Sequence, residues 1–176
     1  MRIIAGRLKG AIFSSPHGYR THPMSDKARG ALFNVLGDIE DLSVLDAFAG
    51  SGALAFEALS RGAATATLIE KDKAAQRAIT DNIAVLAIKN KAKLIQASAN
   101  AWLRTSDNTF DLVFLDPPYD DLQTKLLVEL ADRIKTGGVM VISLPPDETV
   151  PLGLAYQHLA THAYGDATLA FYRRIS

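Results

Sequence analysis

The stretch that decides the fold is residues 43–60, SVLDAFAGSGALAFEALS, in which an apolar run, a glycine pair and an alanine-rich run follow one another. The run 43–48 has the length of a β-strand and little polar alternation, which is typical of a strand buried on both faces. The run 53–60 has its apolar residues at the spacing of an amphipathic helix. A strand that passes into a helix through a glycine turn predicts an α/β fold.

The same pattern of a short apolar run followed by a helical stretch recurs along the chain. Further strands are predicted at 66–70, 93–96, 111–115 and 139–143, and further helices at 73–87 and 122–135. This alternation indicates a parallel sheet covered by helices on both sides, with right-handed crossovers. A helix over 26–36, capped by Ser25, precedes it. Residues 156–173 predict two strands around the turn sequence YGD at 164–166, so the sheet should end in an antiparallel hairpin.

The composition predicts one domain that needs neither disulfides nor a metal ion. The chain has 176 residues, 48% of them hydrophobic, which is enough for a single core. It has no cysteine, and its four histidines lack the spacing of metal ligands. No run approaches the roughly 20 apolar residues of a membrane span, and residues 1–10 lack the apolar core of a signal peptide. We therefore expect a cytoplasmic protein without membrane contact.

Charge is distributed unevenly along a chain whose net charge is zero. Residues 1–36 contain six basic residues and one acidic residue, a net charge of +5, which the remainder balances with −5. The six basic residues are Arg2, Arg7, Lys9, Arg20, Lys27 and Arg29. Such a segment can neutralise phosphates and steer a polyanion toward a site, so a nucleic-acid partner is one interpretation. A solvated surface hairpin is the other.

The glycine pair lies where an α/β sheet binds its ligands, at the carboxyl end of a strand. Gly50 and Gly52 allow the backbone to approach a ligand closely. Asp46 ends the strand before them, and Glu70 ends the next strand, 18 residues after Gly52. An acid at that second position binds ribose hydroxyls, so the pattern predicts a nucleoside cofactor and suits NAD as well as S-adenosylmethionine. Asp46 favours S-adenosylmethionine, because a carboxylate can hold an amino group and repels a pyrophosphate.

The sequence Asp116-Pro117-Pro118-Tyr119 directly follows the predicted strand 111–115. Two prolines stiffen a strand exit, but that structural role does not explain the flanking Asp and Tyr. If the Asp116 carboxylate and the Pro117 carbonyl each accept an N–H, they can hold the exocyclic amino group of a base toward a methyl donor. Tyr119 offers a ring for stacking, worth roughly 1 to 3 kcal/mol. A paired base must be flipped out to enter such a site.

Four further motifs resemble the bacterial 16S ribosomal RNA guanine-N2 methyltransferases, a family of the class I S-adenosylmethionine-dependent methyltransferases. They are MRIIAGRLKG at 1–10, PMSDKARGALFNVL at 23–36, EALSRG at 57–62 and YGD at 164–166. The resemblance covers nearly the whole chain. His22, Met24 and Gly30 stand where the family usually has arginine, threonine and glutamate, and Ser98 replaces its common Asp or Asn at the adenine-binding position.

The resemblance implies a Rossmann-like fold with a seven-stranded, mostly parallel sheet, a C-terminal antiparallel hairpin and an N-terminal β-hairpin. Residues 1–36 would be a basic extension that contacts RNA, and residues 37–176 the methyltransferase domain. The implied reaction is methylation of a guanine N2 in 16S ribosomal RNA, free or in the small subunit, by a monomer with S-adenosylmethionine. The implied cofactor residues are Asp46, Phe48, Gly50, Ser51, Gly52, Glu70, Ser98 and Asp116. The implied catalytic residues are Asp116, Pro117, Pro118 and Tyr119.

Three other functions are compatible with parts of the pattern. An adenine-N6 methyltransferase acting on DNA or RNA would use the same four residues at 116–119, although this chain has little room for a separate target-recognition region. A non-catalytic RNA-binding protein could keep the fold, but it would have no need of that motif. A nicotinamide oxidoreductase could use the glycine loop, and a donor-binding assay distinguishes it.

Overall fold

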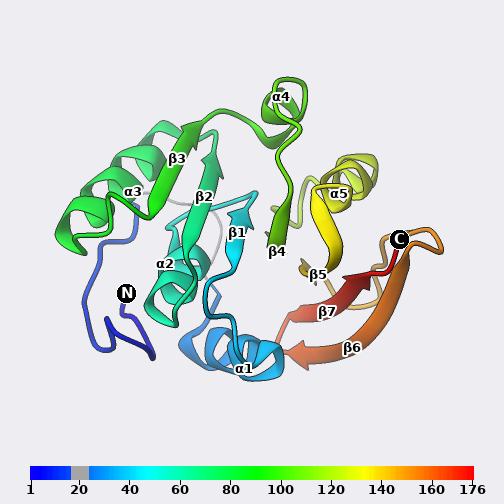
Figure 1. Ribbon diagram of the computed structural model, residues 1–176, viewed down its shortest axis with the longest axis horizontal. Helices are drawn as coiled ribbons and strands as arrows, with labels where there is room; N and C mark the ends of the chain where they lie inside the picture. The colour runs from blue at the N-terminus through cyan, green and yellow to red at the C-terminus, as the bar shows by residue number, and fades with distance from the viewer. Residues whose placement is uncertain (17–23) are drawn as a thin grey trace.

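A computed structural model describes residues 1–16 and 24–176, and its centre is a seven-stranded sheet of order β3-β2-β1-β4-β5-β7-β6 (Figure 1). The strands are β1 Ser43–Asp46, β2 Thr65–Glu70, β3 Ala92–Gln96, β4 Phe110–Leu115, β5 Ile134–Leu144, β6 Tyr156–Tyr164 and β7 Ala167–Arg174. The helices are α1 Asp26–Leu36, α2 Ala53–Ser60, α3 Lys73–Val85, α4 Ala99–Leu103 and α5 Thr124–Ala131. Strands β1 to β5 pair in parallel, and β7 pairs antiparallel with both β5 and β6. The predicted Rossmann-like fold is confirmed.

Helices cover both faces of the sheet, and neighbouring residues of each central strand point to opposite faces. Each strand therefore contributes side chains to two cores. Val44 and Leu112 pack into a core that includes residues of α1, α2 and α3. Leu45 and Val113, one residue further along the same strands, pack into a second core with residues of α4 and α5. The apolar runs lack polar alternation for this reason.

The predicted start of the fifth strand is wrong. The sequence predicts a helix to residue 135 and a strand from 139, whereas α5 ends at Ala131 and β5 begins at Ile134. The pairing with β4 shifts register between Phe110 and Leu112, which accommodates extra residues of β5 there. A residue without a side chain is needed at Gly138, because a Cβ at that position would clash with the carbonyl oxygen of Asp111, 2.7 Å away. The spacing of apolar residues along one strand does not predict such a register shift, because the shift depends on the pairing with the neighbouring strand.

The N-terminal segment folds back on itself as the resemblance implies, although among its described residues only one pair, Arg2 and Ile12, forms a β-bridge. Its residues Ile3 and Phe13 are buried in the core shared with α1, α2 and α3. The ring of Phe13 meets that of Phe56 edge-on at 5.5 Å. This segment therefore packs against the same core as the rest of the chain. The division at residue 36 remains a prediction from the sequence.

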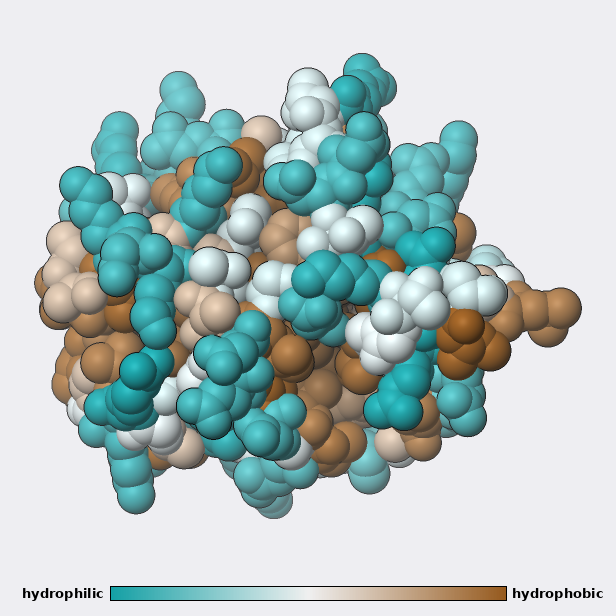
Figure 2. Space-filling view, in the orientation of Figure 1, coloured by the Kyte–Doolittle hydropathy of each residue, from teal (hydrophilic) through white to brown (hydrophobic). Residues whose placement is uncertain are grey.

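The face seen in Figure 2 is mostly hydrophilic, with hydrophobic side chains visible between the polar ones. Within residues 1–16 and 24–176, no helix is both long enough and apolar enough to cross a membrane.

Candidate active site

A cavity of about 1250 Å³ opens at the carboxyl end of the parallel strands. Its lining comes from the loop between β1 and α2, the ends of β2 and β4, the start of α4, the turn between β6 and β7, and the first turn of α1. This volume exceeds the upper end of the range typical for one small ligand, roughly 300 to 1,000 Å³. The cavity is large enough for a cofactor and a second reactant together.

The glycine loop takes a backbone shape that few other residues allow. Gly50 has φ +54° and Gly52 has φ +80°, both in the left-handed region. A Cβ on Gly52 would lie 2.6 Å from two ring atoms of Phe56. Gly50 lines the cavity, as predicted, whereas Gly52 does not belong to its lining and forms the N-cap of α2. Gly52 therefore shapes the loop from behind the site.

Glu70 holds this loop in place and also lines the cavity. One of its carboxylate oxygens accepts the N–H of Gly50 at 2.7 Å, and the other accepts the N–H of Asp72 at 2.7 Å. Burial raises the pKa of Glu70, while these backbone hydrogen bonds act in the opposite direction. Because each carboxylate oxygen can accept a second hydrogen bond, Glu70 can also bind a ligand hydroxyl.

Asp46 is almost completely buried at the end of β1. Burial, with the negative charges of Asp116 and Glu70, raises its pKa to about 7. Its oxygen Oδ1 has no hydrogen-bond partner among the residues that the structure describes. A buried carboxylate oxygen without a partner is costly, so a cationic or N–H donor group of a ligand would satisfy it.

Asp116 follows β4 and is half-buried on the cavity. Burial raises its pKa, and a hydrogen bond with the side chain of Ser143 partly opposes that shift. The Ser143 hydroxyl also lies 2.7 Å from the hydroxyl of Tyr119. Ser143 thus connects the catalytic candidates. The sequence prediction missed it, although a polar residue in the apolar run 139–144 was a usable signal.

The structure brings most of the other predicted site residues onto the same cavity. Phe48, Ser51, Ser98, Pro117 and Pro118 all line it. The Ser98 hydroxyl oxygen accepts the N–H of Ala101 at 3.2 Å and caps α4. Its own O–H remains able to donate to a ligand in the cavity.

The charges on the cavity lining are predominantly negative. The acidic lining residues are Asp46, Glu70, Asp72, Asp116, Asp120, Asp121 and Asp166. Among the lining residues given by the described part of the chain, Lys71 is the only lysine or arginine. The cavity therefore favours a cationic ligand and disfavours a pyrophosphate. The described residues contain no cluster of three potential metal ligands.

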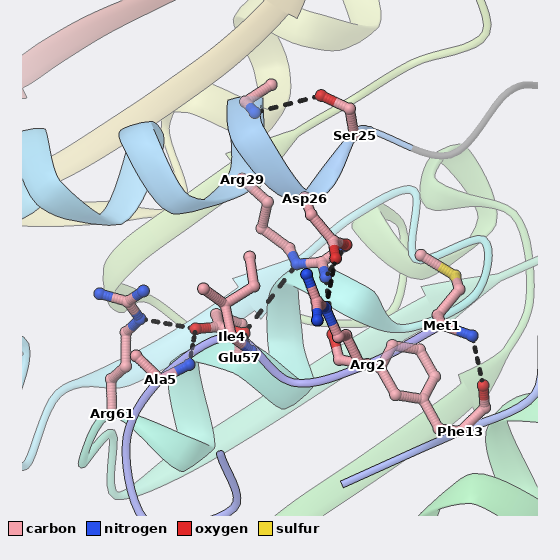
Figure 3. Close-up of polar contacts among 11 residues, drawn as sticks. Met1, Arg2, Ile4, Ala5, Phe13, Ser25, Asp26, Arg29, Glu57 and Arg61 are labelled. Atoms are coloured by element: carbon pink, nitrogen blue, oxygen red, sulfur yellow. Dashed lines mark hydrogen bonds and ion pairs between the residues drawn. The ribbon is translucent and has the colours of Figure 1, made fainter. Parts of the chain in front are cut away.

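The prediction that Arg29 contacts RNA is wrong, because its side chain is completely buried. Figure 3 shows its guanidinium between the N-terminal segment and α2. Nη2 donates to the Arg2 carbonyl at 2.7 Å and to Asp26 at 2.9 Å, and Nε lies 3.9 Å from the Glu57 carboxylate. A guanidinium enclosed in this way cannot reach a phosphate. Its basic character supports the fold instead.

The other basic residues of the N-terminal segment are exposed where the structure describes them. Arg7, Lys9 and Lys27 are exposed, and Arg2 is exposed while it forms an ion pair with Asp26 at 2.8 Å. Arg20 and His22 lie outside the described residues. RNA contact by the remaining basic residues of residues 1–36 stays a prediction from the sequence.

Comparison with known proteins identifies the relatives of this chain. A family model described as conserved hypothetical protein 95 matches residues 1–173. Ribosomal RNA small subunit methyltransferase D of Escherichia coli K12 is 42% identical over 139 residues, 78% of this chain and 68% of that protein. The protein of that name from Buchnera aphidicola of Acyrthosiphon pisum is 36% identical over 135 residues, 76% of this chain and 70% of its own.

A solved structure from Escherichia coli, named "Putative methyltransferase", has a TM-score of 0.88 and 31% identity over 100% of this chain and 98% of its own. The chain therefore belongs to the conserved hypothetical protein 95 family, and the resemblance to bacterial ribosomal RNA methyltransferases found in its sequence is confirmed.

Proposed function

We propose that this protein methylates ribosomal RNA of the small subunit with S-adenosylmethionine, and that the acceptor is the N2 amino group of a guanine. The observation that carries the proposal is the position of Asp116, which lies on the same cavity as Asp46, Gly50 and Glu70. The names of the relatives, ribosomal RNA small subunit methyltransferases D, support the RNA substrate.

S-adenosylmethionine, which carries positive charges on its sulfur and its amino group, fits the predominantly negative lining of the cavity. When bound, it supplies an electrophilic methyl group on a positively charged sulfur. Asp46, with its unpartnered Oδ1, can accept the ammonium group of the methionine portion. Glu70 can accept from the ribose hydroxyls, and the Ser98 hydroxyl lies on the lining for the adenine. NAD would place its pyrophosphate among these carboxylates, which is unfavourable.

Asp116 and its neighbours prepare the amino group for transfer. The lone pair of an exocyclic amino group is delocalised into the ring, so the nitrogen must be held in a geometry in which it can react. The Asp116 carboxylate and the Pro117 carbonyl can each accept one of its N–H groups. The new nitrogen–carbon bond would form as the sulfur–methyl bond breaks and leaves its electron pair on the sulfur. The nitrogen would then lose one proton, which Asp116 can accept. The raised pKa of Asp116 suits this role.

The proposed function is tested by methyl transfer from S-adenosylmethionine to naked ribosomal RNA, small subunits and DNA, with nucleoside analysis of the products. We expect N2-methylguanosine from RNA or subunits and no methylated base from DNA. N6-methyladenosine as the main product would show the adenine alternative instead. Binding of NAD without binding of S-adenosylmethionine would exclude a methyltransferase.

Asp46→Asn is expected to weaken S-adenosylmethionine binding by roughly 10- to 100-fold, because a hydrogen bond to a charged group is lost. It should also stabilise the free protein at pH 8. The folded pKa of Asp46 is raised from 3.8 to about 7, so the native state binds more protons than the unfolded state between these values. Stability therefore falls as pH rises through this window, and asparagine removes that loss.

Calorimetry at pH 8 and melting temperatures at pH 5 and pH 8 test this expectation for Asp46. The variant should melt above the wild type at both pH values, by a clearly larger margin at pH 8 than at pH 5, because only part of the window between 3.8 and about 7 has been crossed at pH 5. A difference in melting temperature that is the same at both pH values would contradict the assigned titration.

Replacing Arg7, Lys9 and Lys27 together with glutamine is expected to weaken RNA binding and to flatten its salt dependence. Each lost phosphate contact should reduce the slope of log affinity against log salt by roughly 0.7 to 0.9. A matched variant replaces Arg77, Lys89 and Lys93, which are also exposed and lie on α3 and beyond it. Equal slopes for the two triple variants would mean that the N-terminal segment is an ordinary solvated surface.

A further inference from the structure

The turn between β6 and β7 lies on the same cavity as Asp116, on the side away from the glycine loop. In the sheet, β4 is separated from β7 by two strand spacings, about 10 Å. Leu144 of β5 pairs with Thr168 of β7, so the turn lies at the carboxyl end of the parallel strands. Tyr164 and Asp166 from this turn both line the cavity. The part of the cavity lined by this turn therefore lies beside Asp116 and away from the glycine loop.

Asp166 presents to the cavity a carboxylate without an ion-pair partner among residues 1–16 and 24–176. Its side chain is exposed at the mouth of the site. Burial is the main reason that the pKa of Tyr119 is raised, and the negative charges of Asp116 and Asp166 add to that shift. Both carboxylates therefore act on the space beside the Tyr119 hydroxyl.

The turn itself does not require an acidic residue at this position. Tyr164 pairs with Ala167, which leaves Gly165 and Asp166 as a two-residue connection, and Gly165 has φ +65°. Asparagine is at least as well suited as aspartate to such a turn. The backbone explains where the side chain lies, whereas its negative charge is free for a contact with the substrate.

The two candidate bases differ in the atom next to their amino group. In guanine the N2 amino group is adjacent to N1–H, which is a hydrogen-bond donor. In adenine the N6 amino group is adjacent to an unprotonated N1, whose lone pair a carboxylate repels. We infer that Asp166 accepts the N1–H of the target base and thereby selects guanine over adenine. The inference rests on the proposed function, because it concerns the acceptor of the same methyl transfer.

This contact divides recognition between two carboxylates on one edge of the base. Asp116 binds the amino group that reacts, and Asp166 reads the adjacent ring nitrogen. A site built around a hydrogen-bond donor of its substrate rejects an analogue without that donor, since the acceptor in the site then loses its partner. A flipped base offers this edge to the protein once it has left its pairing partner. Discrimination of guanine therefore requires Asp166 in addition to the motif at 116–119.

Asp166→Asn tests the inference because asparagine keeps the turn and removes the charge. We expect kcat/KM for guanine methylation to fall by about 10-fold, because the amide oxygen can still accept the N1–H but the hydrogen bond loses its charged acceptor. The melting temperature and S-adenosylmethionine affinity should stay at the wild-type values. Asp81→Asn, which removes the same charge from the exposed face of α3, should keep wild-type activity.

A modified RNA separates a contact with N1–H from a general effect of charge. RNA with 2-aminopurine at the methylated position keeps the N2 amino group and lacks the proton on N1. The wild type should prefer guanine over 2-aminopurine by roughly 10- to 100-fold. In Asp166→Asn the amide can donate to the unprotonated N1, so this preference should fall toward one. An unchanged preference in the variant would overturn the inference.

The proposed function and the role of Asp166 are contradicted by different results. If the wild type produces no N2-methylguanosine from any RNA, the proposed function is wrong. If the wild type produces it and Asp166→Asn keeps both the rate and the preference for guanine, the proposed function stands and the role of Asp166 is wrong.

Discussion

Asp116→Ala is expected to lower kcat for methyl transfer by about 100- to 1,000-fold, the usual effect of removing one well-placed acceptor from a transition state. Asp116 lies on the cavity with Tyr119 and Ser143, whose hydroxyl oxygens lie 2.7 Å apart. Its pKa is raised by burial, so the folded protein gains nothing from its negative charge at neutral pH. The melting temperature should therefore stay at or above that of the wild type, and the S-adenosylmethionine affinity should stay close to the wild-type value.

Two further variants make the Asp116 experiment specific. Asp116→Asn should lose less activity, because its amide oxygen still accepts one hydrogen bond, and Asp81→Ala removes a surface carboxylate as a control. Single-turnover rates, melting curves and calorimetry separate catalysis from folding and binding. If Asp116→Ala turned over at nearly the wild-type rate on a confirmed substrate, the amino-group mechanism would have to be abandoned.

Glu57→Ala is expected to reduce the free energy of unfolding by about 3 to 5 kcal/mol, the usual cost of removing one partner of a buried ion pair. The completely buried Glu57 carboxylate accepts the N–H of Ile4 at 2.7 Å and that of Ala5 at 3.0 Å. It also accepts from Arg61 Nε at 2.8 Å and lies 3.9 Å from Arg29 Nε (Figure 3). Alanine leaves the two backbone donors without their acceptor and the buried Arg29 guanidinium without its neighbouring negative charge.

Glu129→Ala is the matched control for Glu57→Ala, since Glu129 also pairs with a residue four positions away on its helix. Its partner Lys125 lies 3.8 Å away, and both side chains are largely exposed. The cost of that change should stay below about 1 kcal/mol. Urea unfolding of both variants measures the difference. Equal losses would mean that the buried carboxylate does not fix the N-terminal segment to α2.

The sequence by itself determined the elements whose signals are local. The helix at 26–36, its Ser25 cap and the helix at 53–60 were predicted with the bounds that the structure has. Apolar period, glycine position and turn residues act over a few residues, so a single chain read in order reveals them. The acidic strand ends and the motif at 116–119 were found in the same way, because the fold brings strand ends to one edge.

The tertiary structure alone decided which polar residues are buried and which distant residues meet. Arg29 looked like a phosphate ligand until packing enclosed it with Glu57, 28 positions away along the chain. Ser143 meets the hydroxyl of Tyr119, 24 positions earlier in the sequence. Asp166 reaches the cavity because β7 pairs antiparallel with β5. Charge and polarity are properties of single residues, whereas burial and hydrogen-bond partners are fixed only when the elements pack together.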